Sequence, residues 1–349
     1  MKSNRKLASI QKVRDIAPIE GADRIELAHV LGWQCVVDKG QFQKGDLCVY
    51  FEIDSFLPET PAFAFLRASS YRESDIMGRG YHLRTMRMRG QLSQGLILPL
   101  SAFPVIPADA EPGTDVTALL GVRKWETEER ATTGGTVIGP LPPDVPHTDE
   151  TRIQAMPALL EAFRGREYYI STKMDGSSHS LSLDETGFHV TGHNYEYKDD
   201  GSSAFYEFVK KKGYEKAMRQ FAKNSGIRTL TIQGEFCAPG IQGNRLKLTK
   251  PEWYVFTVRM NGQRMNLQEM LGIAAEIGAP TVPIEEVGRD LPARYPTVEA
   301  LLARAEGTYP NGGPKEGIVI RPTQPVPCPA TGAPLSVKVV SNRYLLKHS

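Results

Sequence analysis

Several features that mark large classes of protein are scarce in this sequence or missing from it. The 349 residues include only four cysteines, which lie far apart and form no CxxC pair, so we expect reduced thiols rather than a disulfide or zinc scaffold. No run approaches the roughly 20 consecutive apolar residues of a transmembrane helix. The first residues carry charge without the apolar core of a secretory signal. We therefore expect a cytoplasmic protein without a membrane partner.

An excess of one charge is also missing, because 42 Lys and Arg against 40 Asp and Glu leave a net charge of only +2. The distribution is more informative than the total. Six arginines and two acids lie between residues 67 and 89, interleaved with Tyr71, Tyr81 and His82. Such a segment suits phosphate pairing and base stacking, although a solvated strand face explains it equally well. A second basic run, at 210–219, faces either nucleic acid or solvent.

The length predicts two domains, and the residue pattern changes along the chain. Residues 1–125 form short, nearly alternating apolar and polar segments separated by Gly, Pro and Asp turns. This pattern predicts a small β-barrel of the OB-fold type, with a short helix only at 114–121. Residues 126–150 are rich in Gly, Pro and Thr and lack periodicity, which predicts a linker.

Residues 151–349 alternate strand-like and helix-like segments, which predicts a mixed α+β domain. The segments expected to be strands are 167–172, 178–183, 188–193, 229–236, 253–260, 317–322 and 335–340. The segments with helical spacing are 203–224, 266–277 and 298–306.

Charged residues occur at the ends of these strands or within them. Lys-Met-Asp-Gly at 173–176 follows the first strand, and a match of this kind alone is common. Three further charges follow in order: Glu235 near the end of one strand, Glu316 directly before another, and Lys338 inside the last. Because a charge in a buried strand needs a compensating role, the ordered set indicates a functional site.

The order K-x-D-G, G-E, aromatic strand, E-G-I-V and lysine strand resembles the covalent nucleotidyltransferases: DNA ligases, RNA ligases and mRNA-capping guanylyltransferases. Only eleven residues follow Lys338, so we expect no C-terminal OB domain like that of DNA ligases and capping enzymes. The strand-rich segment in front, together with HTDETRIQ at 147–154, resembles ATP-dependent RNA ligases with an N-terminal OB domain. Those enzymes seal 3′-OH/5′-phosphate nicks in duplexes whose 3′-OH strand is RNA.

This resemblance implies an α+β protein in which an OB-fold β-barrel (1–125) precedes an ATP-grasp-like nucleotidyltransferase domain (151–349) with antiparallel sheets. It implies a monomer that acts in RNA repair. Lys173 is then the nucleophile that attacks the α-phosphate of ATP and forms lysyl-AMP. Burial beside cationic neighbours and a bound metal is expected to favour the neutral amine.

The resemblance also implies the ligand contacts. Asp175, Glu235 and Glu316 are expected to hold Mg²⁺ or Mn²⁺ through metal-bound waters, because Mg²⁺ gives up its hydration shell reluctantly. Phe256 is expected to stack on adenine, with Ile318 or Val319 on the other face, although core packing also explains an aromatic strand. The remaining implied nucleotide contacts are Thr172, Arg152 at the β- or γ-phosphate, Glu235 at the ribose and Lys338 at the α-phosphate.

The sequence departs from the family pattern at three positions. Ser336 stands where many relatives have a second lysine, His193 where they have an arginine, and Thr151 where a lysine would strengthen triphosphate binding. A packed strand histidine explains His193 as well as a functional role does. Two alternative functions stay open: another covalent nucleotidyltransferase (a DNA ligase or a capping guanylyltransferase), or a non-catalytic nucleic-acid-binding protein.

Overall fold

The computed structural model describes residues 5–126 and 135–348, which divide into two compact units. The first unit contains the described residues up to 126 together with 154–157 and 342–348, and the second contains 135–153 and 158–341. The chain returns to the first unit twice after leaving it. No helix in the described part of the chain is long and apolar enough to cross a membrane.

Antiparallel strands build the first unit. One sheet has the order β10-β4-β1-β2-β3, a second has the order β11-β5-β7-β6, and β8 and β9 form a hairpin. The strands are β1 (Ala8–Pro18), β2 (Ile25–Val30), β3 (Trp33–Asp38), β4 (Leu47–Phe51), β5 (Ser55–Pro58), β6 (Tyr71–Ser74), β7 (Gly78–His82), β8 (Thr85–Met88), β9 (Gln91–Gln94), β10 (Leu96–Pro99) and β11 (Arg123–Lys124). The helical elements are η1 (Pro61–Leu66), α1 (Arg67–Ser70), η2 (Leu100–Ala102) and α8 (Asn342–His348). Ile10, Val49 and Phe51 are fully buried, so the alternating pattern produces the core of this unit.

The prediction of a short helix at 114–121 is wrong, because most of this segment forms turns. Asp115 accepts a hydrogen bond from the backbone N–H of Thr117, and the Thr117 hydroxyl bonds to the backbone of Ala8 in β1. Asp and Thr side chains that bond to nearby backbone compete with helix formation, and here the contact with β1 prevails.

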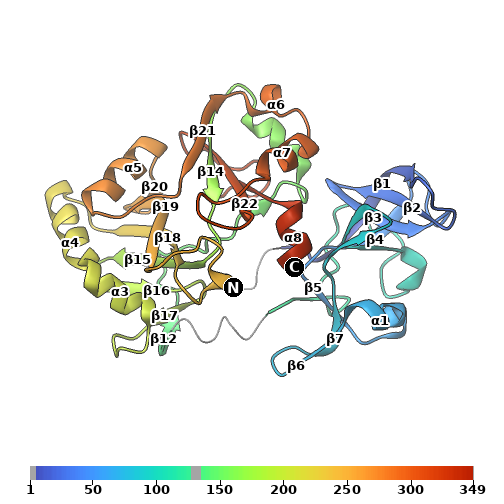
Figure 1. Cartoon of the computed structure of the whole chain (residues 1–349), viewed down its shortest axis with the longest axis horizontal. Helices are drawn as coiled ribbons and strands as arrows, with labels where there is room; N and C mark the ends of the chain where they lie inside the picture. The colour runs from blue at the N-terminus through green and yellow to red at the C-terminus, as the bar shows by residue number, and fades with distance from the viewer. Residues whose placement is uncertain (1–4, 127–134, 349) are drawn as a thin grey trace. The chain divides into compact units, whose positions relative to one another are not determined.

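The second unit contains a seven-stranded antiparallel sheet with the order β12-β17-β16-β15-β18-β19-β20. Its strands are β12 (Val137–Pro140), β15 (Ser177–Leu183), β16 (Phe188–Thr191), β17 (Tyr195–Tyr197), β18 (Leu230–Cys237), β19 (Glu252–Met260) and β20 (Gln263–Arg264). The helices α3 (Ala204–Lys212), α4 (Tyr214–Ser225) and α5 (Leu267–Glu276) lie along this sheet (Figure 1). Phe205, Met218 and Ile273 from these helices share one core with Ile232 and Trp253 of the sheet.

The helical segment expected at 203–224 is two helices. Gly213 separates α3 from α4 in the left-handed conformation (φ 71°) and its N–H bonds to the carbonyls of Val209 and Lys210. Glycine adopts this conformation without the steric cost of a Cβ, so Lys-Gly at 212–213 ends the first helix.

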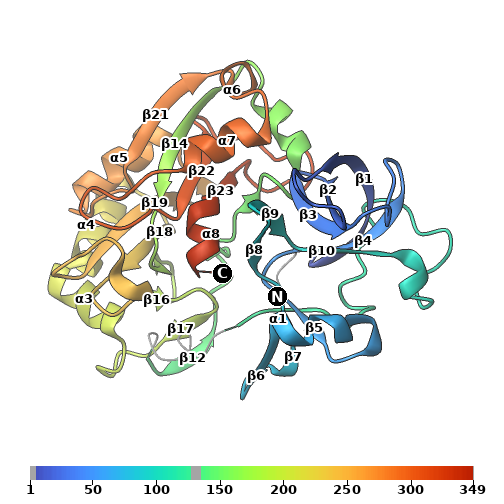
Figure 2. The ribbon, with the colours of Figure 1, turned by 45° about the vertical axis from the view of Figure 1, so that its right-hand side comes forward.

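A five-stranded sheet completes the second unit, with the order β13-β23-β22-β14-β21. Its strands are β13 (Thr151–Arg152), β14 (Glu167–Lys173), β21 (Ile284–Arg289), β22 (Gly317–Pro322) and β23 (Val337–Val340), and the remaining helical elements are η3 (Pro157–Phe163), η4 (Gln242–Asn244), α6 (Leu291–Arg294) and α7 (Val298–Ala305). Figure 2 shows β21, β14 and β22 side by side, with α7 near β22 and β23. Only β13 pairs in parallel among the described strands of this sheet. Residues 174–176 lead directly from β14 in this sheet to β15 in the other.

The segment 126–150, for which we expected a linker, contains a strand. β12 pairs with β17 and so belongs to the seven-stranded sheet, while residues 127–134 lie outside the described part of the chain. Because the pairing partner lies more than 50 residues later, the local Gly- and Pro-rich composition gives no sign of it.

Candidate active site

Lys173 is the last residue of β14, where the chain leaves one sheet for the other. Its Nζ lies 2.7 Å from Oε2 of Glu316, and the two side chains are 22% and 16% exposed. Residue 316 directly precedes β22, and β22 pairs with β14 so that Lys173 lies opposite Gly317. The pairing of these two strands therefore brings together two charges that are far apart in sequence.

The other two predicted acids lie beside this pair. Glu235 of β18 accepts a hydrogen bond at 3.1 Å from the backbone N–H of Gly176, and Asp175 forms a buried ion pair with Arg245. A Cβ at position 176 would lie 2.5 Å from the carbonyl oxygen of Phe236. Glycine is therefore required here for the close approach of the 174–176 segment to β18.

The charges of these carboxylates alter the titration of the lysine. Burial alone would lower the pKa of Lys173, but the negative charges of Glu316, Glu235 and Asp175 raise it above its ordinary value. Burial, together with the charges of Glu316 and Asp175, raises the pKa of Glu235 to about 8 against the opposing effect of Lys173. The strongest electrostatic effects on Nζ thus come from carboxylates, which favour the charged ammonium group rather than the neutral amine that we expected.

Strand register decides which predicted residues share a face with Lys173. Paired residues of neighbouring strands project to the same side, and successive residues of one strand project to opposite sides. Ser171 pairs with Val319, and Val319 pairs with Lys338; since Ser171 is two residues before Lys173, all lie on the Lys173 face.

Ile318 and Thr172 pair with each other and therefore lie on the opposite face. Ile318 has no exposed surface, and the Thr172 hydroxyl donates a hydrogen bond to Glu285 at 2.7 Å. The interpretation of these two side chains as nucleotide contacts is not supported. Of the pair Ile318 or Val319, the register favours Val319.

The last two predicted contacts are Arg152 and Phe256. Arg152 of β13 lies beside Lys338 in parallel register. Phe256 of β19 is partly buried and packs near Met174 in a small apolar cluster, while the guanidinium of Arg321 lies over its ring at 5.6 Å. Phe256 thus lies against the apolar cluster that contains Met174, the residue directly after Lys173.

Comparison with known proteins identifies the family. An OB-fold domain model matches residues 7–100 and the RNA ligase model matches residues 166–340, which is half of the chain. This chain belongs to the RNA ligase family.

Solved structures of a Naegleria gruberi RNA ligase are similar to this RNA ligase over its whole length. An apo point mutant is 33% identical, covers 100% of this chain and 99% of its own, and has a TM-score of 0.89. A mutant solved with ATP and Mn is 33% identical over 99% of both chains with a TM-score of 0.88, and a mutant with AMP and Mn has the same values. No curated protein sequence matches. The family resemblance and the N-terminal OB domain are thus confirmed.

The sequence analysis did not identify Tyr309, which links Lys173 to Glu316. The Tyr309 hydroxyl donates to the carbonyl oxygen of Lys173 at 2.7 Å and accepts from the backbone N–H of Glu316 at 3.1 Å. Burial and the negative charge of Glu316 raise the pKa of this phenol, so it stays protonated. Residue 309 lies in a loop with no strand or helix pattern, so no local signal marks it.

The described partners of His193 and of the basic residues at 210–219 are not the charged residues of the candidate site. Nε2 of His193 lies 3.3 Å from Asp149, and its ring contacts that of His147 at 5.8 Å. In the run 210–219, three of the five cations have acidic partners: Lys210 with Asp199 and Glu207, Lys212 with Glu252, and Arg219 with Glu215. These surface ion pairs favour a solvated helix face.

Proposed function

We propose that the chain is an ATP-dependent ligase that seals 3′-OH/5′-phosphate nicks in duplexes whose 3′-OH strand is RNA, through a lysyl-AMP intermediate. The observation that carries the proposal is the contact of Lys173 Nζ with Glu316 at 2.7 Å, with Asp175 and Glu235 alongside. The solved relatives that contain ATP or AMP together with Mn support the choice of nucleotide.

In the first step Nζ of Lys173 attacks the α-phosphorus of ATP. A P–N bond forms, the bond to the β-phosphate oxygen breaks, and pyrophosphate leaves. One proton must leave Nζ before the attack, and Oε2 of Glu316 is the acceptor in contact with it. Phosphoryl transfer depends on in-line positioning and charge neutralisation, and Lys338 and Val319 lie on the same face as the nucleophile.

In the second step an oxygen of the RNA 5′-phosphate attacks the lysyl-AMP phosphorus, so that the P–N bond breaks and a P–O–P linkage forms. In the third step the 3′-OH attacks the 5′-phosphorus, AMP leaves and a phosphodiester remains. Lys338 supplies positive charge for the phosphate of AMP during these steps, whereas Arg152 acts on the β- or γ-phosphate in the first step. The neutralised phosphates are then open to nucleophilic attack.

The acid cluster is suited to a divalent cation. Three carboxylates lie near the Lys173 ammonium group, and one of them, Asp175, is also paired with Arg245. Burial, with a contribution from the charges of Glu316 and Asp175, raises the pKa of Glu235 to about 8. Asp175, Glu235 and Glu316 would hold Mg²⁺ or Mn²⁺ through metal-bound waters, because Mg²⁺ gives up its hydration shell reluctantly. Such a cation, when bound, neutralises the charge of the triphosphate.

The OB unit is proposed to hold the nicked duplex for a cytoplasmic RNA repair reaction carried out by the monomer. Its basic segment projects Arg79, Arg87 and Arg89 to solvent, and Tyr71 and Arg67 form a cation–π pair at 4.6 Å. Arginines and aromatic rings of this kind pair with phosphates and stack on bases.

The test is to incubate the protein with α-³²P-ATP or α-³²P-GTP and divalent metal, then to run a denaturing gel beside the Lys173→Ala variant. A covalent label from ATP that requires Lys173 supports the proposal. Labelled protein is then given nicked duplexes that differ only in RNA or DNA at the 3′-OH strand, and sealing of the RNA strand is expected. A label from GTP alone would indicate a capping guanylyltransferase. No label from either nucleotide would refute the chemistry and leave a nucleic-acid-binding protein.

A further inference from the structure

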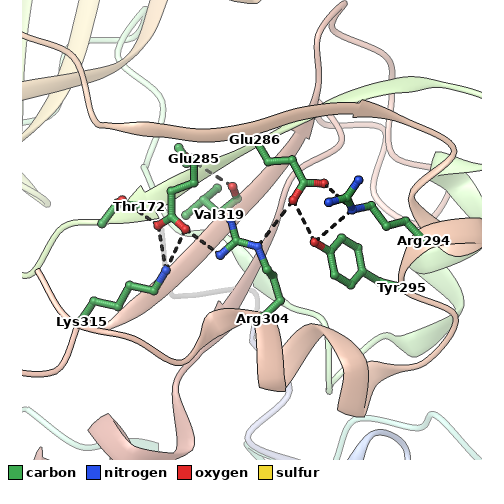
Figure 3. A network of polar contacts seen from close by, with 9 residues as sticks. Thr172, Glu285, Glu286, Arg294, Tyr295, Arg304, Lys315 and Val319 are labelled. Carbon is green, nitrogen blue, oxygen red and sulfur yellow. Dashed lines mark hydrogen bonds and ion pairs between the residues drawn. The ribbon is translucent and has the colours of Figure 1, made fainter.

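Two adjacent acids on β21, Glu285 and Glu286, lie at the centre of the polar network in Figure 3. Ile170 of β14 pairs with Glu286 whereas Ser171 pairs with Ile284, so Glu285 is the extra residue of a β-bulge. Successive strand residues ordinarily face opposite sides, and a bulge changes the direction of one of them. Both carboxylates consequently reach Arg304, at 2.7 Å and 3.5 Å.

Glu285 contacts Thr172 and Lys315, the residues that directly precede Lys173 and Glu316. Its Oε1 accepts a hydrogen bond from the Thr172 hydroxyl at 2.7 Å, and the Nζ of Lys315 lies 2.8 Å from both of its oxygens. Thr172 directly precedes the nucleophile Lys173, and Lys315 directly precedes Glu316. Lys315 is only 7% exposed, so this ion pair is shielded from solvent and its geometry is tightly defined.

These contacts act on the face of β14 opposite the nucleophile. Tyr309 joins the backbone of Lys173 to that of Glu316, and Glu285 joins the side chains of the two preceding residues. The alignment of the Lys173–Glu316 pair is therefore held by two independent connections. Neither Glu285 nor Lys315 itself contacts Nζ of Lys173 through a described interaction.

Glu286 provides an internal contrast. It accepts hydrogen bonds from Tyr168 at 2.6 Å and Tyr295 at 2.8 Å, and pairs with Arg294 at 3.1 Å. None of these three partners is adjacent in sequence to a residue of the proposed site. Glu286 thus shares the strand, the half-buried surroundings and Arg304 with Glu285, but not the connection to the nucleophile.

We propose that Glu285 is a positioning residue that sets the distance and direction between Lys173 and Glu316 for adenylylation. This inference rests on the proposed function. Because a displacement of about 1 Å in reacting groups costs on the order of 100-fold in rate, loss of the Glu285 connection lowers the adenylylation rate at saturating ATP. The ATP concentration at half-saturation stays nearly unchanged, since Glu285 is on the far side of the strand from the nucleotide.

The experiment measures single-turnover labelling with α-³²P-ATP over a range of ATP concentrations, for the full chain. The variants are Glu285→Gln, Thr172→Val, their double mutant and the control Glu286→Gln. Thr172→Val replaces the hydroxyl with a methyl group and leaves the Glu285–Lys315 pair in place, so it keeps the test valid if Glu285→Gln fails to fold. Thr172→Ser retains the hydroxyl and is expected to restore the rate.

We expect Glu285→Gln and Thr172→Val each to lower the rate at saturating ATP by about 10- to 100-fold, and the double mutant to lose less than the product of the two losses, as contacting residues do. Glu286→Gln is expected to label within about threefold of wild type, even if it lowers the melting temperature. Wild-type rates in both Glu285→Gln and Thr172→Val would overturn the inference, as would an equal loss in Glu286→Gln. Absence of label in the wild-type protein would instead refute the proposed function.

Discussion

Tyr309→Phe tests whether the backbone link between Lys173 and Glu316 is needed for reaction. The substitution keeps the ring, which packs with Met174 and Cys237, and removes a hydroxyl that makes two hydrogen bonds, at 2.7 Å and 3.1 Å. Each buried backbone group left without a partner costs about 1–3 kcal/mol. For two such groups we therefore expect the free energy of unfolding of the second unit to fall by about 2–6 kcal/mol.

The same change loosens the two segments that carry the nucleophile and its carboxylate. We expect the single-turnover adenylylation rate at saturating ATP to fall about 10- to 100-fold. Urea denaturation gives the stability change, and labelling with α-³²P-ATP gives the rate.

Tyr50→Phe is the matched control for this prediction. Its hydroxyl donates one buried hydrogen bond to the carbonyl of Gln94 at 3.1 Å in the first unit. Loss of about 1 kcal/mol is expected there, with no change in adenylylation. If Tyr309→Phe labels as fast as wild type while losing the predicted stability, the hydroxyl serves folding alone and the positional argument is refuted.

Three further changes test the site. Val319→Ala is expected to raise the ATP concentration at half-saturation about 3- to 10-fold, whereas Ile318→Val costs about 0.5–1.5 kcal/mol of stability and leaves that concentration unchanged. Titration of the labelling rate with ATP measures the first effect, and urea unfolding measures the second. The reverse pattern would show that the register argument is wrong. Gly176→Ala is expected to abolish labelling, because its Cβ would lie 2.5 Å from the Phe236 carbonyl oxygen; wild-type labelling by this variant would contradict the packing. The adenylylation rate is expected to rise with pH across the neutral and mildly alkaline range, because the raised pKa of Lys173 makes the neutral amine scarce below it; a rate that is flat from about pH 6 to 9 would contradict this protonation state.

The charged residues that the structure brings together could be found in the sequence because they lie within, at the ends of or next to strands that local alternation reveals. Lys173, Glu235 and Lys338 follow or interrupt apolar strand segments, and the strands form where the pattern predicts them. The two-unit organisation with an N-terminal OB domain follows from the same change of pattern. These features depend on local order along the chain, which the sequence contains directly.

What could not be predicted depends on pairing between distant segments. The choice between Ile318 and Val319 requires the register of β22 against β14, and a slip of one residue would reverse it. Glu285 acquires its role from a bulge and from contacts with residues 113 positions earlier and 30 later. Neither a bulge nor a partner at that separation leaves a periodic signal. The end of the first helix at Gly213 could have been predicted, because Lys-Gly at a helix end is a recognisable stop signal. The apolar spacing continues past Gly213, and for that reason we expected one helix over 203–224.

The protonation of Lys173 is the least predictable feature, and it orders the events of the reaction. A lysine paired with Glu316 at 2.7 Å and facing two more carboxylates is held as an ammonium group, which cannot attack phosphorus. Positive charge must therefore enter the site, or the carboxylates must be engaged elsewhere, before the neutral amine appears. In the proposed mechanism, a hydrated cation held by Asp175, Glu235 and Glu316 would supply that charge and engage these carboxylates. In the proposed mechanism, the binding of ATP and the cation therefore precedes the deprotonation of Lys173, and deprotonation precedes the attack on phosphorus.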